Sequence, residues 1–162
     1  MTVWLPAYIG IGSNLENPQA QVLAAFDALA GIARTRLVAR SPLYTTRPFG
    51  PVQQEDFVNA AAGVLTQLTA PELLEQLRAI EAARGRRREQ RWGPRIIDLD
   101  LLVYADQRIA TPDLTVPHPG IVERNFVLYP LADIAPQLQV PGVGRVADLK
   151  VRVDPAGIAV LG

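Results

Sequence analysis

Two aspartates, Asp98 and Asp100, stand two positions apart within an otherwise apolar stretch at residues 96–104. If this stretch is a strand, both side chains point to the same face, about 6–7 Å apart along the chain. Two carboxylates at that spacing repel each other, and a cation removes the repulsion. Mg²⁺ takes one or two carboxylates and completes its shell with substrate phosphates. The pair is therefore a candidate magnesium site, although a strand with one polar face in water has the same pattern.

The segment before this pair is rich in arginine. Six arginines lie within twelve residues: Arg84, Arg86, Arg87, Arg88, Arg91 and Arg95. Fifteen of the sixteen basic residues in the chain are Arg, so codon preference explains the choice of Arg over Lys but not the clustering. A guanidinium group matches the geometry of phosphate oxygens. Arginines that lead directly into a carboxylate pair predict a site for nucleotide phosphates.

The elements that position these residues follow from periodicity and from the turn residues. We expect strands at residues 4–11, 37–44, 57–66 and 96–104, helices at 17–30, 69–84 and 121–131, a turn at 12–14, loops at 46–56 and 85–95, and a weak strand and turn region from residue 140. The strand and helix order is β-α-β-β-α-β, the ferredoxin-like split βαβ pattern. We therefore predict a single α+β domain over residues 1–162, with helices packed on a mostly antiparallel sheet and extra C-terminal elements. Many functions share this fold, so function must come from the site.

Composition excludes several classes of protein. Apolar residues make up 49% of 162 residues, but none of their runs approaches the about 20 residues that span a bilayer. Cysteine is absent, and the first residues lack the basic start of a secretion signal, so we expect a cytoplasmic location without membrane contact. Sixteen acidic residues balance sixteen basic ones, which disfavours a general nucleic-acid binder.

The segment RWGPRIIDLDLL, residues 91–102, closely resembles the signature of the 6-hydroxymethyl-7,8-dihydropterin pyrophosphokinases of folate biosynthesis. Other segments resemble the motifs of that family in the expected order, from about residue 7 to residue 136. These segments are residues 11–15, 41–51, 56–60, 81–88, 114–119 and 124–131. Several motifs in one order are far more specific than the Asp pair alone.

The resemblance implies a reaction and a set of residues. The family transfers the β,γ-pyrophosphoryl group of ATP to the hydroxymethyl oxygen of the pterin and releases AMP. The implied metal ligands are Asp98 and Asp100, which would hold two Mg²⁺ ions, with Arg88 and Arg95 as further catalytic residues. The implied ATP contacts are Glu81, Arg88, Trp92, Arg95, His118 and Arg124. We expect a monomer whose partners are ATP and a reduced pterin, and expect the loops at 46–56 and 85–95 to order when ATP binds.

On the pterin side, the resemblance implies ring stacking between Phe57 and Phe126, hydrogen bonding by Asn59, and backbone contacts from Thr46 and Phe49. Flat heterocycles favour aromatic faces, and an amide both donates and accepts. Without the family, core packing would be the better explanation of the two phenylalanines. Asn59 is different, because a buried amide in an apolar strand needs partners.

Individual residues and other function classes stay open. His118, taken alone, fits a structural or surface role better than a catalytic one, and Trp92 either stacks on a base or covers its loop. Arg78 replaces an amide that family members often carry, which leaves the adenine contact open. An RNA-binding module would need an aromatic strand motif that this sequence lacks. A metal-dependent phosphodiesterase would release AMP without a pterin.

Overall fold

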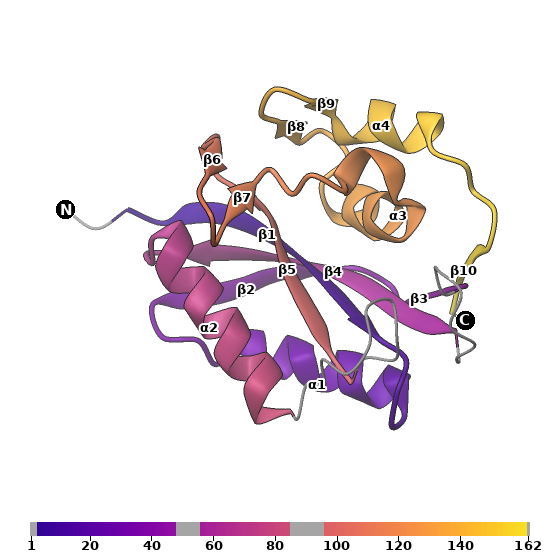
Figure 1. Ribbon diagram of the computed structural model, residues 1–162, viewed down its shortest axis with the longest axis horizontal. Helices are drawn as coiled ribbons and strands as arrows, with labels where there is room; N and C mark the ends of the chain where they lie inside the picture. The colour runs from indigo at the N-terminus through magenta and orange to yellow at the C-terminus, as the bar shows by residue number, and fades with distance from the viewer. Residues whose placement is uncertain (1–2, 48–55, 85–95, 162) are drawn as a thin grey trace.

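A computed structural model describes residues 3–47, 56–84 and 96–161 of the chain (Figure 1). The helices among them are α1 (Pro18–Ala30), α2 (Ala70–Ala83), the short 3₁₀ helix η1 (Ile121–Glu123), α3 (Asn125–Ile134) and α4 (Val146–Arg152). The strands are β1 (Leu5–Ser13), β2 (Thr35–Arg40), β3 (Tyr44–Thr46), β4 (Phe57–Thr66), β5 (Asp98–Tyr104), β6 (Ile109–Ala110), β7 (Thr115–Val116), β8 (Gln139–Val140), β9 (Gly144–Arg145) and β10 (Ile158–Val160). No helix in these ranges is long and apolar enough to cross a membrane.

The main sheet has the order β10-β3-β4-β1-β5, and β2 pairs with β4 beside β3. All of these pairings are antiparallel. If β2 and β3 are taken as one edge strand, the first four strands follow the ferredoxin-like order that the sequence predicts. The predicted α+β class is therefore confirmed, with α3, α4 and β10 among the added C-terminal elements.

Local sequence signals explain where the two long helices begin. Thr69 and Glu72 form a reciprocal capping box at the start of α2, in which the Thr69 N–H donates to Glu72 Oε1 at 2.8 Å and the Glu72 N–H donates to Thr69 Oγ1 at 3.2 Å. At α1, the Asn17 side chain accepts from the Ala20 N–H, and Pro18 occupies the first helical position. Both starts lie where the sequence predicts them.

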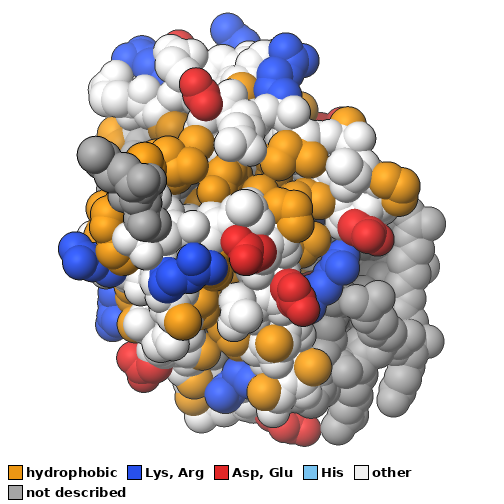
Figure 2. All heavy atoms as spheres, turned by 90° about the vertical axis from the view of Figure 1, so that its left-hand side faces the viewer, with side chains coloured by type: hydrophobic (Ala, Val, Ile, Leu, Met, Phe, Trp, Pro, Cys, Tyr) orange, Lys and Arg blue, Asp and Glu red, His pale blue; other side chains and the backbone are white. Residues whose placement is uncertain are grey.

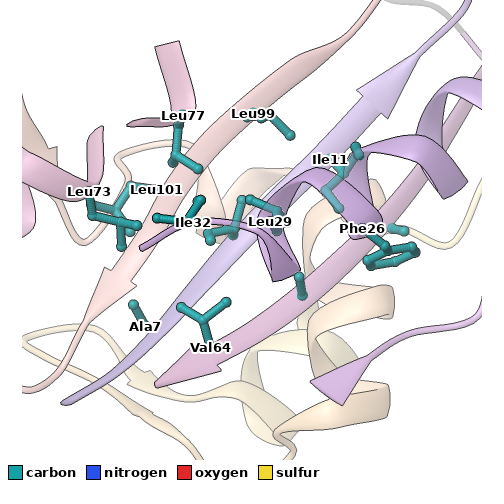
Figure 3. Close-up of a cluster of buried hydrophobic side chains, with 14 of the residues drawn as sticks. Ala7, Ile11, Phe26, Leu29, Ile32, Val64, Leu73, Leu77, Leu99 and Leu101 are labelled. Atoms are coloured by element: carbon teal, nitrogen blue, oxygen red, sulfur yellow. The ribbon is translucent and has the colours of Figure 1, made fainter. Parts of the chain in front are cut away.

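One face of the sheet packs on α1 and α2 (Figure 3). Phe26 and Leu29 from α1 and Leu73 and Leu77 from α2 are fully buried there. From the sheet come Ile9 and Ile11 of β1, Val64 of β4, and Leu99 and Leu101 of β5. The alternation in β5 therefore turns Leu99 and Leu101 into this core, as predicted, and leaves Asp98 and Asp100 on the opposite face.

The opposite face is only partly covered. Leu128 and Leu131 of α3 and Val146 and Leu149 of α4 bury against Ala61, Leu102 and Val103 of the sheet. Leu102 and Val103, which follow the aspartates on β5, belong to this second cluster, and α3 packs mainly on β4. The end of β5 that carries Asp98 and Asp100 lies outside the cluster.

Several predicted boundaries were wrong. The strand expected at residues 37–44 is interrupted after Arg40, since Pro42 has no N–H to donate and Ser41 bonds Ala61 instead. The turn expected at 12–14 begins later, because β1 continues to Ser13. The helix expected at 121–131 is a 3₁₀ turn followed by α3, and α4 lies where strand and turn were expected.

Candidate active site

Register aligns residues of four strands in one row across the open face. Gly12 of β1 pairs with Asp98 of β5 on one side and with Asn59 of β4 on the other, and Asn59 also pairs with Tyr44 of β3. Directly paired residues in antiparallel strands project to the same face. Asp98, a predicted metal ligand, and Asn59, a predicted pterin contact, therefore share one face with Gly12 between them.

Gly12, which lies between Asp98 and Asn59 in this row, has no side chain. A Cβ built at Gly12 would lie 2.8 Å from Asn59 Oδ1 and 4.0 Å from a ring carbon of Phe57. The first distance is far shorter than a carbon–oxygen contact allows, so a larger residue would displace the amide. Gly10, two residues earlier on the same face, pairs with Asp100. Glycines therefore stand opposite both aspartates, and the space above them is taken by Asn59 Oδ1 at Gly12 and by the Leu102 side chain at Gly10.

Asn59 is buried, with 6% of its surface exposed, and its amide is anchored. Its Nδ2 donates to Thr46 Oγ1 at 2.7 Å. Thr46 pairs with Phe57, so the three predicted pterin residues on the sheet lie on adjacent positions of β3 and β4. One amide hydrogen is used by this bond, and the second hydrogen and the carbonyl oxygen retain capacity for further bonds.

Asp98 is half-buried and Asp100 is exposed, and both lie on this same face of the sheet. The described residues contain no cluster of three or more His, Cys, Asp or Glu side chains that could hold a metal by themselves. Two carboxylates suit Mg²⁺, which keeps several coordination positions for water and substrate phosphates. The donor set therefore fits a metal that arrives with a nucleotide.

His118 lies beside this pair on the connection between β7 and η1. The backbone N–H of His118 donates to the Leu102 carbonyl oxygen at 2.8 Å, and this bond attaches the connection to β5. Burial of the ring lowers the pKa of His118 below its usual 6.5, the nearby Asp100 charge opposes that shift, and Arg124 adds to it. Nδ1 accepts from the Gly120 N–H at 3.0 Å, so in the neutral ring the proton sits on Nε2, which can donate to a ligand.

Arg124 and Phe126 meet at the start of α3. The Arg124 guanidinium carbon lies 5.7 Å from the centre of the Phe126 ring. A Cβ at Gly120 would lie 2.7 Å from Arg124 Nε, so the missing side chain at Gly120 lets the arginine pack over the backbone there. The charges of Arg124 and Asp100 act on the pKa of His118 in opposite directions.

A family model described as 7,8-dihydro-6-hydroxymethylpterin-pyrophosphokinase matches residues 8–136. The chain belongs to this family. It is 50% identical over 151 residues to the 2-amino-4-hydroxy-6-hydroxymethyldihydropteridine pyrophosphokinase of Pseudomonas aeruginosa, with 93% of each chain covered. It is 45% identical over 152 residues to the enzyme of the same name from Methylorubrum extorquens, covering 94% of this chain and 96% of that protein.

Solved structures of this family support the fold. The wild-type HPPK-DHPS of Plasmodium falciparum with pteroate has a TM-score of 0.72 at 15% identity and covers 92% of this chain. An HPPK-DHPS in complex with substrates has a TM-score of 0.74 at 13% identity and covers 93% of this chain. The chain spans only 42% and 43% of those two proteins, so the likeness concerns the pyrophosphokinase fold alone.

Glu81 occupies a different place from the other predicted site residues. It belongs to α2 and is buried, with 5% of its surface exposed. Its Oε2 accepts the Leu99 N–H at 2.9 Å, so its carboxylate reaches the backbone of β5 between the two aspartates. Arg78, one helical turn earlier, donates to the Asp113 carbonyl oxygen at 3.3 Å. The geometry gives Glu81 a structural contact in addition to the ATP contact that the resemblance implies.

Four predicted site residues lie outside the described residues: Phe49, Arg88, Trp92 and Arg95. The expected loops at 46–56 and 85–95 fall almost wholly outside them too. Gly10 and Gly12, which pair with Asp100 and Asp98, were not assigned to the site by sequence reasoning. The signal was present, since two glycines two apart in a strand mirror the spacing of Asp98 and Asp100.

Proposed function

We propose that this chain transfers the pyrophosphoryl group of ATP to the hydroxymethyl oxygen of 6-hydroxymethyl-7,8-dihydropterin, with release of AMP, as a step of tetrahydrofolate biosynthesis. Membership of the pyrophosphokinase family supports the reaction. The row of paired residues Asp98, Gly12 and Asn59 carries the assignment of the site. It sets the Asp98 carboxylate in line with the anchored Asn59 amide, with Gly12 between them.

In this proposal Asp98 and Asp100 hold two Mg²⁺ ions together with the phosphates of ATP. When bound, the ions would neutralise phosphate charge and lower the pKa of the pterin hydroxyl. His118 donates from Nε2, and Arg124, Glu81 and Trp92 contribute to ATP binding. Arg88 and Arg95 neutralise charge that develops as the bond to AMP breaks. Phosphoryl transfer depends on positioning and charge neutralisation more than on covalent help from the protein.

The acceptor lies on the other side of Gly12. Asn59 bonds the amide-like edge of the pterin, while Phe57 and Phe126 enclose its ring, and Thr46 and Phe49 add backbone contacts. The support is local: Thr46 orients the Asn59 amide through the 2.7 Å bond, and Phe57 lies beside Gly12. A monomeric state and a cytoplasmic location stay predictions.

The test is an assay with purified protein, ATP, Mg²⁺ and 6-hydroxymethyl-7,8-dihydropterin. We expect AMP and the pterin diphosphate to appear in equal amounts, and neither to appear without the pterin or after removal of Mg²⁺. AMP release in the absence of pterin would indicate a phosphodiesterase. No AMP under any of these conditions would contradict the proposal.

A further inference from the structure

Asn125 ties the start of α3 to a later segment of the chain, residues 154–161. It is the first residue of the helix and lies between Arg124 and Phe126. Its Nδ2 donates to the carbonyl oxygens of Asp154 at 2.8 Å and Ala156 at 2.9 Å. An amide nitrogen has two hydrogens, so both of its donors are used on one turn of backbone. The Ala156 N–H closes that turn on Asp154 Oδ1 at 2.9 Å.

The same segment then becomes the outermost strand of the sheet. Ile158 pairs with Thr46 and Val160 pairs with Tyr44, and two further bonds flank the pairing: the Arg47 N–H donates to the Gly157 carbonyl at 3.3 Å, and the Leu161 N–H donates to the Leu43 carbonyl at 2.8 Å. In Figure 1 the chain descends from α4 and ends beside β3. Within eight residues it therefore connects α3 with β3.

Both attachment points border the proposed pterin pocket. Asn125 precedes Phe126 on the helix side. On the sheet side, Thr46 is paired with Ile158 and accepts the hydrogen bond that orients Asn59. The two walls of the pocket belong to separate elements, so their separation depends on whatever links these elements. Tyr44 Oη bonds Asp133 further along α3, and residues 154–161 supply a link at the start of that helix.

We propose that Asn125 and the segment 154–161 are a positioning device that holds Phe126 of α3 at a set distance from Thr46 and Asn59 of the sheet, and so determine how tightly the pterin binds. The inference rests on the proposed function, since it assigns the pterin to this pocket. Neither Asn125 nor the segment touches the reacting atoms in this scheme. Their effect appears in pterin affinity more than in ATP affinity.

Asn125→Ala is the first test, with Gln137→Ala as its matched control. Gln137 accepts an exposed hydrogen bond from Arg145 Nη1 at 2.7 Å, so the control also deletes a surface side-chain contact. We expect Asn125→Ala to raise the KM for the pterin about tenfold, from the loss of two hydrogen bonds, and to change the KM for ATP less than about twofold. Gln137→Ala leaves both constants unchanged. A lower Tm for Asn125→Ala with an unchanged pterin KM would indicate a merely structural bond and overturn the inference.

A pair of proline variants tests the strand link independently. The hydrogen bonds at Gly157 and Leu161 set the alternation of β10, which places the Ala159 N–H toward β3 and the Val160 N–H away from it. Ala159→Pro should therefore raise the pterin KM, and Val160→Pro should not. Equal effects of the two prolines, or no effect of either, would refute the positioning role. If the unaltered protein forms no AMP, the proposed function fails, whereas an active protein with unaffected variants refutes this inference alone.

Discussion

The carboxylate of Glu81 accepts a hydrogen bond of 2.9 Å from the backbone N–H of Leu99, the residue between Asp98 and Asp100. Strand β5 lies at the end of the sheet and pairs with β1 on one side. An edge strand has outward N–H groups without a neighbouring strand. Glu81 provides an acceptor for one of them, so helix α2 fixes the backbone at the level of the aspartate pair.

Replacing Glu81 by Leu should therefore damage both stability and catalysis, while Gln should largely restore both. Leucine leaves the buried Leu99 N–H without its acceptor, at a cost of about 1–3 kcal/mol, whereas the Gln oxygen can still accept. Urea unfolding measures the stability, and turnover as a function of Mg²⁺ concentration measures the effect on the aspartates. If Glu81 acts only through ATP, both variants will raise the KM for ATP and neither will lower the free energy of unfolding.

Asp98→Ala should abolish turnover in a folded protein. The carboxylate is the proposed ligand of a metal ion, and metal ions supply several kcal/mol of transition-state stabilisation, so we expect a loss of about a thousandfold or more. Far-ultraviolet circular dichroism reports the fold. Asp106→Ala in the turn after β5 is the matched control, since it removes an exposed carboxylate a few residues further along the chain. Near-normal turnover of Asp98→Ala would exclude the metal assignment.

Much of the fold could be predicted because its long elements carry clean signals. Strand β4 spans Phe57–Thr66, as its apolar composition between polar loops predicts. Helix α4 could not be predicted, since its buried residues Val146 and Leu149 provide a single helical repeat within seven residues. The division into β2 and β3 depends on Ser41, whose Oγ accepts the Ala61 N–H at 2.9 Å where a continuous strand was expected.

In the candidate site too, local sequence identifies some residues, whereas the placement of others depends on contacts between distant segments. Asp98 and Asp100 are conspicuous in the sequence because carboxylates interrupt an apolar strand. The position of Gly12 between Asp98 and Asn59 depends on the register of three strands that are far apart in the sequence, and a slip of one residue would reverse its face. The Glu81 contact depends on how α2 packs on β5, which helical periodicity alone does not determine.

Gly12→Ala should weaken pterin binding with little effect on ATP. The added Cβ would lie 2.8 Å from Asn59 Oδ1, so the amide must move away from the position in which Thr46 orients it. Gly10→Ala is the control on the same strand and face, where the nearest atom to the new Cβ is a Leu102 methyl carbon at 3.4 Å. We expect a pterin KM raised by about tenfold, equivalent to about 1.4 kcal/mol, for Gly12→Ala. Equal effects of the two alanine variants would contradict the assignment of Gly12 to the pterin site.

Tyr44→Phe should change how stability depends on alkaline pH. Burial of the phenol raises the pKa of Tyr44 well above its usual 10.0, and the hydrogen bond and negative charge of Asp133 raise it further. The folded protein thus keeps Tyr44 neutral at a pH at which the unfolded chain ionises it. The stabilisation that neutral Tyr44 contributes is complete below the pKa that this phenol has in the unfolded chain, and it is lost as pH rises above about 10. Urea unfolding of both proteins from about pH 8 to 11 should show a steeper loss for the unaltered protein, with Tyr104 titrating in both; parallel curves would contradict the assignment.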